Sequence, residues 1–392
     1  MESNEVGTDE FLSWREGVYV EPMIAVNLGT RGIEAAAQLV EYVNIEGGTA
    51  LADYRRSNGR EQPWVVKLWC LGNEMDGPWQ IGHKSAHEYG RLAAEAGRAM
   101  RLVDPSIELV ACGSSSRRMP TFGEWERVVL EETFDVVNFL SLHAYYEQKG
   151  DDRTNFLASG EMMHRFLREV VSIADEVALR QGSPYRIDLS FDEWNVWCVE
   201  EFDGEESLPL QGVGPLFEDH YSSLDAVVVG DLLITLLRNV DRVKAACLAQ
   251  LVNALAPIIT NPGGSSWRQT TFYPFREVST LCRGAAVVGT TVDVNDIVTL
   301  EYGEIPRVSA VSVETALGKA LTFVTNRGGR PVQIELVGSD STRRISQQRT
   351  LVSDHDGPHH GPDDASFAIP RPVADFDLGI LPAEPWSIIE WE

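Results

Sequence analysis

Short apolar runs alternate with longer amphipathic stretches over roughly the first 255 residues. Each run is almost continuously apolar over five to eight residues, which is typical of parallel strands covered on both faces. The stretches between the runs have helical periodicity, and Asp104-Pro105 predicts the end of the second one. This alternation predicts an α/β sheet, either open or closed into a barrel. The predicted strands are Pro22–Leu28, Val65–Gly72, Glu108–Cys112, Val136–Leu142, Ile187–Phe191 and Ala245–Val252, and the predicted helices are Ile33–Val43, Ser85–Val103, Phe122–Glu132, Ser159–Gln181 and Ser223–Val240.

The pattern changes after the loop Thr260–Pro274 and one more predicted helix near Phe275–Arg283. From about residue 285 onward, β-rich runs such as RVSAVSVETALG, KALTFVTNRGG and PWSIIEWE alternate with turn signals. We therefore predict a first domain over residues 1–283 and a separate antiparallel β-sandwich over residues 284–392. The segment Ser353–Asp364 is rich in histidine and aspartate, but its spacing matches no metal-ligand geometry, so we interpret it as a solvated loop.

Charge and cysteine usage narrow the class of protein. There are 33 Lys and Arg against 59 Asp and Glu, a formal net charge of −26, which argues against nucleic acid or an anionic membrane as a partner. The N-terminus lacks the pattern of a signal peptide, and no apolar run reaches the ~18 residues of a membrane span, so we expect a cytoplasmic protein. Cys70, Cys112 and Cys247 lie inside apolar runs, which predicts buried free thiols rather than a disulfide or zinc site.

Polar residues stand where several predicted strands end. In a closed parallel barrel, reactive groups project from the C-terminal ends of the strands, so these residues are candidates for a site. They are Asn73 and Glu74, His143 and Tyr145, Asp192, Glu193 and Asn195, and Gln250 inside the last run.

Two carboxylates, Glu74 and Glu193, are thus placed at the same edge of one sheet. Such a pair suits the hydrolysis of an acetal, because one carboxylic acid kept neutral protonates the leaving oxygen while the other attacks or activates water. The alternative is that each glutamate caps a loop or pairs with an arginine. The nearby tryptophans could stack on sugar rings, although tryptophan is also common in cores; they are Trp69, Trp79, Trp194 and Trp197.

Four segments resemble glycoside hydrolase family 51, the α-L-arabinofuranosidases. They are EPMIAVNLGTRG, KLWCLGNEMDGPWQIGHKSAHEYG, FLSLHAYY and LSFDEWNVW. The resemblance extends over essentially the whole chain, and its most specific part is GNEMDGPWQ, from Gly72 to Gln80. It implies a (β/α)8 barrel, with the acid/base at the end of strand four and the nucleophile at the end of strand seven, followed by the sandwich.

The resemblance implies a role for each matched residue. Glu74 would be the general acid/base and Glu193 the nucleophile of a retaining double displacement, with their carboxyl groups ~5–5.5 Å apart. Asn73 would bind the 2-hydroxyl of an arabinofuranosyl ring. Tyr145 would hydrogen-bond the nucleophile, with His143 behind it as support. In addition, Gln250 would contact the sugar, and Trp79 and Trp197 would line the aglycone side.

The strand count departs from the family. If Glu74 ends strand four, the run Pro22–Leu28 is strand three, and the segment with the first two barrel strands has no counterpart here. Six strands cannot close an eight-stranded barrel, so we expect an incomplete barrel with unpaired edges at strands three and eight. Either the true start lies upstream, or a separate N-terminal polypeptide completes the barrel, or the enzyme has decayed.

The function expected from the sequence is the release of terminal non-reducing α-L-arabinofuranosyl residues from arabinose-containing oligosaccharides, without a metal or other cofactor. The alternative is a catalytically impaired fragment that acts as a sugar-binding or assembly subunit. Another retaining glycosidase of the same clan is a third option, which GNEMDGPWQ and Gln250 disfavour. Members of the family commonly form homo-oligomers, and exposed edges favour the same here.

Overall fold

The computed structural model describes residues 5–198, 217–338, 343–353 and 368–392. Apart from Ser353, the histidine-rich segment Ser353–Asp364 lies outside these residues. The chain divides into two compact units, each described here by itself. The first comprises Met1–Ala144, Arg168–Glu193 and Arg242–Cys247, and the second comprises Tyr145–Leu167, Trp194–Asp241 and Leu248–Glu392. None of the described helices has both the length and the apolar character needed to cross a membrane.

Six strands form the central sheet in the order β1-β2-β3-β4-β5-β6, so that β1 and β6 are its edges. The pairs β1–β2, β2–β3 and β3–β4 are parallel. Every predicted strand of this region is present, but β4 and β5 run further than expected, so the polar residues predicted to follow them lie within the strands. The bounds are β1 Met23–Ala25, β2 Leu68–Cys70, β3 Glu108–Cys112, β4 Phe139–Tyr146, β5 Asp188–Val196 and β6 Val243–Leu248.

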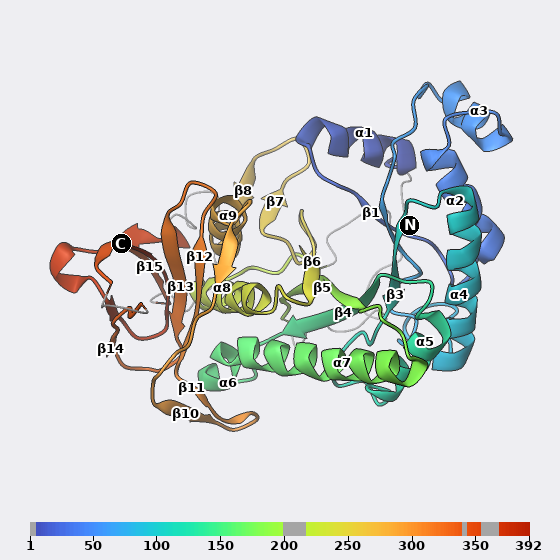
Figure 1. The fold of residues 1–392 in the computed structure, drawn as a ribbon. Helices are drawn as coiled ribbons and strands as arrows, with labels where there is room; N and C mark the ends of the chain where they lie inside the picture. Colours follow the sequence, from blue (N-terminus) through green and yellow to red (C-terminus); the bar gives the residue numbers. More distant parts are fainter. Residues whose placement is uncertain (1–4, 199–216, 339–342, 354–367) are drawn as a thin grey trace. The chain divides into compact units, whose positions relative to one another are not determined.

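Amphipathic helices follow the strands of the first unit. α2 packs against α4, and α4 packs against α5, so that the three lie side by side in Figure 1. α4 begins at a capping box in which Ser85 and Glu88 satisfy each other's backbone amides, and it ends at Val103, with Asp104 as its C-cap, just before Pro105 as predicted. The helices are α1 Thr8–Val18, α2 Ile33–Asn44, α3 Ala50–Ser57, α4 Ala86–Val103, α5 Glu124–Thr133 and α7 Ser159–Gln181, of which α3 was not predicted.

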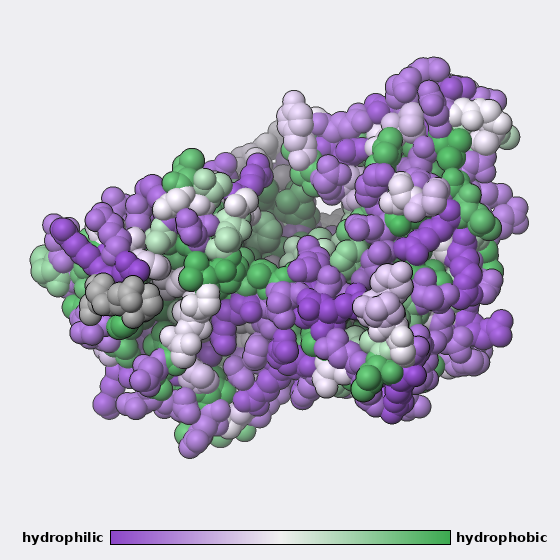
Figure 2. Space-filling model, viewed as in Figure 1, coloured by the Kyte–Doolittle hydropathy of each residue, from purple (hydrophilic) through white to green (hydrophobic). Residues whose placement is uncertain are grey.

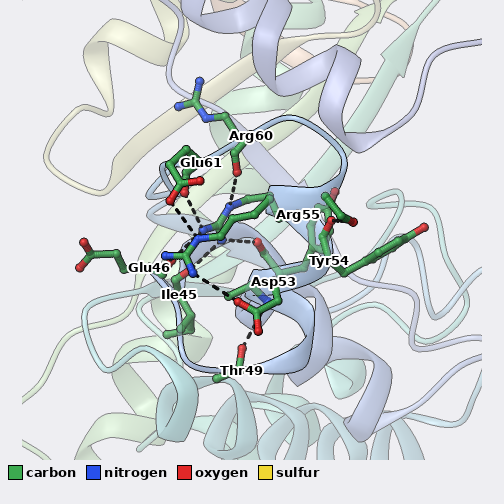
Figure 3. A network of polar contacts seen from close by, with 12 residues as sticks. Ile45, Glu46, Thr49, Asp53, Tyr54, Arg55, Arg60 and Glu61 are labelled. Carbon is green, nitrogen blue, oxygen red and sulfur yellow. Dashed lines mark hydrogen bonds and ion pairs between the residues drawn. The ribbon is translucent and has the colours of Figure 1, made fainter.

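A buried arginine holds the turn between α2 and α3. The side chain of Arg55 is fully buried, and its guanidinium donates to backbone carbonyl oxygens on both sides of α3 (Figure 3). Backbone carbonyl groups that are not paired within a helix or sheet need other hydrogen-bond donors. At this turn, the side chain of Arg55 supplies those donors.

The second unit is built on a six-stranded sheet in the order β16-β15-β18-β13-β12-β9. Its neighbouring strands are antiparallel, as predicted for this part of the chain. The division of domains at residue 284 stays a prediction. The bounds are β7 Ile258–Thr260, β8 Ser266–Arg268, β9 Ala286–Val288, β10 Asp296–Thr299, β11 Gly303–Pro306, β12 Val308–Glu314, β13 Ala320–Asn326, β14 Val332–Gln333, β15 Ile345–Val352, β16 Arg371–Pro372, β17 Ile380–Leu381 and β18 Pro385–Trp391, with helices α6 Arg153–Leu157, α8 Ser223–Arg238 and α9 Phe272–Leu281 and a 3-10 turn at Asp375–Asp377.

Helix α8 is apolar around nearly its whole circumference, and it packs against strands of this sheet. Gly230 lets the indole of Trp386 come close to the helix, because a Cβ at this position would lie 2.4 Å from the ring. Beside it, Asp231 and Arg327 form a buried ion pair at 2.8 Å. Hydrophilic residues cover most of the face seen in Figure 2, in keeping with the acidic composition.

Candidate active site

The loop after β2 places Glu74 in an unusual backbone conformation. Glu74 has φ 46°, in the left-handed region that non-glycine residues seldom adopt, and Gly72 before it has φ 98°. Such conformations cost free energy and persist where the surrounding structure fixes them, often at functional sites. The carboxylate is largely buried, with 12% of the side chain exposed.

Hydrogen-bond donors hold both oxygens of the Glu74 carboxylate. Trp79 donates its indole Nε1–H to Oε2 at 2.6 Å, and the side chain of Gln80 donates as well. The indole can fold back in this way because residue 77 is a glycine, at which a Cβ would lie 2.4 Å from the Trp79 ring. The Trp79 side chain nevertheless remains about half exposed.

His143 on β4 connects Glu74 to a second carboxylate. Its Nδ1 lies 2.9 Å from Oε1 of Glu74 and 3.5 Å from Oε2 of Glu193 on β5. One atom each of Glu74, His143 and Glu193 lie within 4.8 Å of one another. The two glutamates that the sequence placed 119 positions apart along the chain are therefore brought together around one imidazole.

The other side of the imidazole faces a third carboxylate. Nε2 of His143 lies 3.2 Å from Oδ1 of Asp192. Asp192 also accepts hydrogen bonds from the hydroxyls of Ser141, at 2.6 Å, and Ser190, at 2.9 Å. The side chains of His143 and Asp192 are 6% and 8% exposed, so this pair lies beneath the two glutamates, away from solvent.

The electrostatics follow from this arrangement. Burial alone would lower the pKa of His143, but the hydrogen bonds to Asp192 and Glu74 and the charge of Glu193 raise the pKa to about 10. Burial alone would raise the pKa of Glu74, but the hydrogen bonds from His143, Trp79 and Gln80 outweigh it and lower the pKa. The sequence led us to expect the acid of the pair to be kept neutral by its surroundings. The direction in the free protein is the opposite, because these hydrogen bonds lower the pKa of Glu74.

Comparison with known proteins identifies the family. Residues 1–159 match the α-L-arabinofuranosidase 1 domain, and residues 192–366 match the α-L-arabinofuranosidase C-terminal domain. The structure resembles that of a family 51 α-L-arabinofuranosidase from Bifidobacterium longum, with a TM-score of 0.91 and 39% identity over 100% of this chain and 80% of that one. The chain belongs to glycoside hydrolase family 51.

Two curated relatives extend this result. The chain is 49% identical to an intracellular exo-α-(1→5)-L-arabinofuranosidase of Streptomyces lividans, over 91% of this chain and 54% of the relative. It is 52% identical to an exo-α-(1→6)-L-arabinofuranosidase of Bifidobacterium longum, over 83% of this chain and 64% of the relative. This family 51 chain thus spans a little over half to two thirds of these curated relatives. The predicted fold class, an incomplete parallel barrel sheet followed by an antiparallel domain, is confirmed.

The remaining predicted site residues lie in different surroundings. Asn73 and Gln250 are exposed, and Gln250 follows β6 through a cis peptide bond from Ala249. Tyr145 and Trp197, both in the second unit, contact each other edge to face with ring centroids 5.1 Å apart. Trp69 and Trp194 are fully buried and cannot stack on a sugar, so of the two interpretations offered for them the core one holds.

The predictions about the cysteines are confirmed in part. All five cysteines are free, and Cys70 and Cys112 are buried, but Cys247 is exposed because it lies on the edge strand β6. Among the described residues, only Glu74, His143 and Glu193 are grouped closely enough to share a metal ion. A histidine binds a metal ion only through an unprotonated ring nitrogen. Both ring nitrogens of His143 face carboxylates, so we describe these three residues as an acid–base cluster.

Asp192 was expected as a polar residue at the end of a strand, but no role was predicted for it. The sequence nevertheless contains a pattern that indicates such a role. Ser141 and His143 are two residues apart on β4, and Ser190 and Asp192 are two residues apart on β5. Residues two apart in a strand share a face, and polar residues repeated on the covered face of a buried strand need partners there. This pattern could have predicted a buried polar network beneath the glutamates.

Proposed function

We propose that this family 51 chain carries the catalytic carboxylates of a retaining exo-α-L-arabinofuranosidase that releases terminal α-L-arabinofuranosyl residues from oligosaccharides. Glu74 is the general acid/base and Glu193 the nucleophile. The observation that supports this is the approach of the two carboxylates to within 4.8 Å. Retaining glycosidases place their carboxyl groups about 5–5.5 Å apart, whereas inverting enzymes leave room for a water at about 6.5–9.5 Å.

In the first step, the oxygen of Glu193 attacks the anomeric carbon while Glu74 gives a proton to the leaving oxygen, which breaks the glycosidic bond. In the second step, Glu74 takes a proton from water, and that water displaces Glu193 from the sugar. No cofactor takes part. The sugar-binding roles of Asn73, Tyr145 and Gln250, and the aglycone-side roles of Trp79 and Trp197, remain predictions from the family resemblance.

The proposal also covers the location and the assembly of the chain. Because the Streptomyces lividans relative is named an intracellular enzyme, we place this chain in the cytoplasm. Assembly as a homo-oligomer, or with a polypeptide that pairs with the edge strands β1 and β6, stays a prediction.

The test is hydrolysis of aryl α-L-arabinofuranosides by the purified chain. Glu193→Ala should abolish turnover. Glu74→Ala should reduce the rate by about 10²–10⁴-fold for poor leaving groups and much less for good ones, as expected when a general acid is lost. Glu124→Ala on the exposed start of α5 is the matched control.

The stereochemistry provides an independent readout. Proton NMR of the first product should show the α-anomer, which is the outcome of a double displacement. Initial release of the β-anomer, or full activity in Glu193→Ala, would contradict the assignment. Binding of arabinose without turnover would instead favour the sugar-binding subunit.

A further inference from the structure

The buried pair of His143 and Asp192 has no part in the two steps proposed above, yet it is the most enclosed ionisable group of the site. We propose that Asp192 is a positioning residue: it keeps His143 protonated on both nitrogens, and His143 in turn fixes the Glu74 carboxylate in its place and in its ionised form while the site is empty. The role of Glu74 in this inference rests on the proposed function, whereas the protonation of His143 does not.

Both ring nitrogens of His143 face a carboxylate. Nδ1 faces Glu74 at 2.9 Å and Nε2 faces Asp192 at 3.2 Å. A neutral imidazole has one N–H donor and one acceptor nitrogen, whereas ionised carboxylates only accept hydrogen bonds. A neutral His143 would therefore turn an acceptor nitrogen toward one of two acceptors, and only the imidazolium satisfies both contacts.

Two serine hydroxyls fix the position of the Asp192 carboxylate. Ser141 and Ser190 both donate hydroxyl protons to it, so its carboxylate is fixed by hydrogen bonds that a neutral amide in its place would only partly accept. The carboxylate of Asp192 is thus held in place beside a nearly enclosed imidazole, and no arginine or lysine in the described part of the chain forms an ion pair with Asp192.

The ionisable groups around this pair come from several elements. Glu74 follows β2, Glu193 and Asp192 lie on β5, and three thiols with a raised pKa lie nearby. Cys70 on β2 and Cys112 on β3 are buried, and the pKa of Cys247 on β6 is raised to about 11 although that residue as a whole has exposed surface. These thiols are neutral at physiological pH, so the charge around His143 comes from the three carboxylates.

The experiment observes His143 directly by NMR of the full chain labelled with ¹³C and ¹⁵N at histidine, with His143→Gln used to assign its signals. In the wild type, both ring nitrogens of His143 should carry protons from pH 6 to 9. In Asp192→Asn, which keeps the shape and removes the charge, the pKa of His143 should fall toward the ordinary value of about 6.5. Asp293→Asn, at an exposed position of the second unit, is the matched control and should leave the titration unchanged.

Two outcomes would overturn the inference. One is a neutral His143 in the wild type at pH 7, a measurement that needs no variant. The other is a folded Asp192→Asn protein in which His143 titrates as in the wild type. Neither outcome depends on catalysis, so absence of arabinofuranosidase activity would sink the proposed function and leave this test intact.

If the wild type is active, kinetics give a second readout. Asp192→Asn should move the limb of the pH–rate profile that reports Glu74 to higher pH for poor leaving groups, because a neutral His143 no longer lowers the pKa of Glu74, with a smaller effect for good leaving groups and little change in KM. A merely structural role would instead lower the rate equally for both kinds of substrate, and that result would contradict the inference.

Discussion

The turn held by Arg55 gives a prediction that does not depend on function. Arg55 is fully buried, and no carboxylate of the described residues pairs with it in the network of Figure 3. A guanidinium has five N–H donors, and each finds a carbonyl oxygen. Nη1 donates to Tyr42 at 2.8 Å and Ile45 at 2.6 Å, Nη2 to Glu46 at 3.0 Å and Glu61 at 3.3 Å, and Nε to Arg60 at 3.3 Å.

The expected loss can be worked out from these five bonds. An intramolecular hydrogen bond contributes a net of about 1 kcal/mol, so the five bonds together contribute about 5 kcal/mol, which Arg55→Met would remove. Several acceptors lie on partly exposed residues, where water recovers part of that loss, which leaves about 3–4 kcal/mol. Arg55→Lys keeps the charge and up to three donors, so about 2 kcal/mol is expected.

The assay is amide hydrogen exchange over residues 42–61, because the local opening free energy does not require the two units to unfold together. Protection in this segment should fall most in Arg55→Met, less in Arg55→Lys, and not at all in Arg91→Met, a control at an exposed position of α4. If Arg55→Met lost less than about 1 kcal/mol, the five contacts would be contributing nothing beyond what water supplies, and the reasoning would be refuted.

Two further predictions concern the acid–base cluster. Trp79→Phe keeps the ring and removes the N–H that donates to Glu74, so the pKa of Glu74 should rise and the matching limb of the pH–rate profile should move to higher pH; an unchanged profile would contradict this. The pKa of His143 is raised in the folded protein to about 10, above the unfolded value of about 6.5, so its stabilising effect is complete below pH 6.5 and is lost as pH rises toward 10. The unfolding free energy of the wild type relative to His143→Gln, measured in urea from pH 6.5 to 9.5, should therefore shrink with rising pH, and a constant difference would count against it.

Much of the parallel sheet could be predicted from the sequence because its inner strands are largely buried. The run Leu109–Cys112 is continuously apolar for that reason, and β3 has the predicted bounds. Short elements were harder to predict. α3 is held by the Arg55 contacts rather than by an apolar face, and β15, with the polar sequence ISQQRTLV, takes its conformation from pairing with β18. Such tertiary contacts leave little trace in local periodicity.

The candidate site was predictable in its residues but not in its charges. Reading the ends of the strands found Glu74, His143 and Glu193, because parallel strands bring their C-terminal ends to one edge. The protonation pattern depends on distances that no spacing encodes. The hydrogen bonds of His143 to Asp192 and Glu74, together with the charge of Glu193, raise the pKa of the imidazole although burial alone would lower it. The hydrogen bond from His143 is in turn one of the contacts that lower the pKa of Glu74.

This reversal bears on how Glu74 can serve as an acid. Among the donors that lower the pKa of Glu74, the two aromatic rings differ in exposure: His143 is 5% exposed, whereas Trp79 is 54% exposed. A ligand can displace only the accessible donor, and losing the Trp79 bond removes one of the contacts that lower the pKa of Glu74. At the same time, a ligand that excludes water strengthens the effect of burial, which raises the pKa of a carboxyl group. Both changes favour a proton on Glu74 when a leaving oxygen arrives, so the low pKa of the empty site is compatible with an acid that becomes protonated once the substrate is bound.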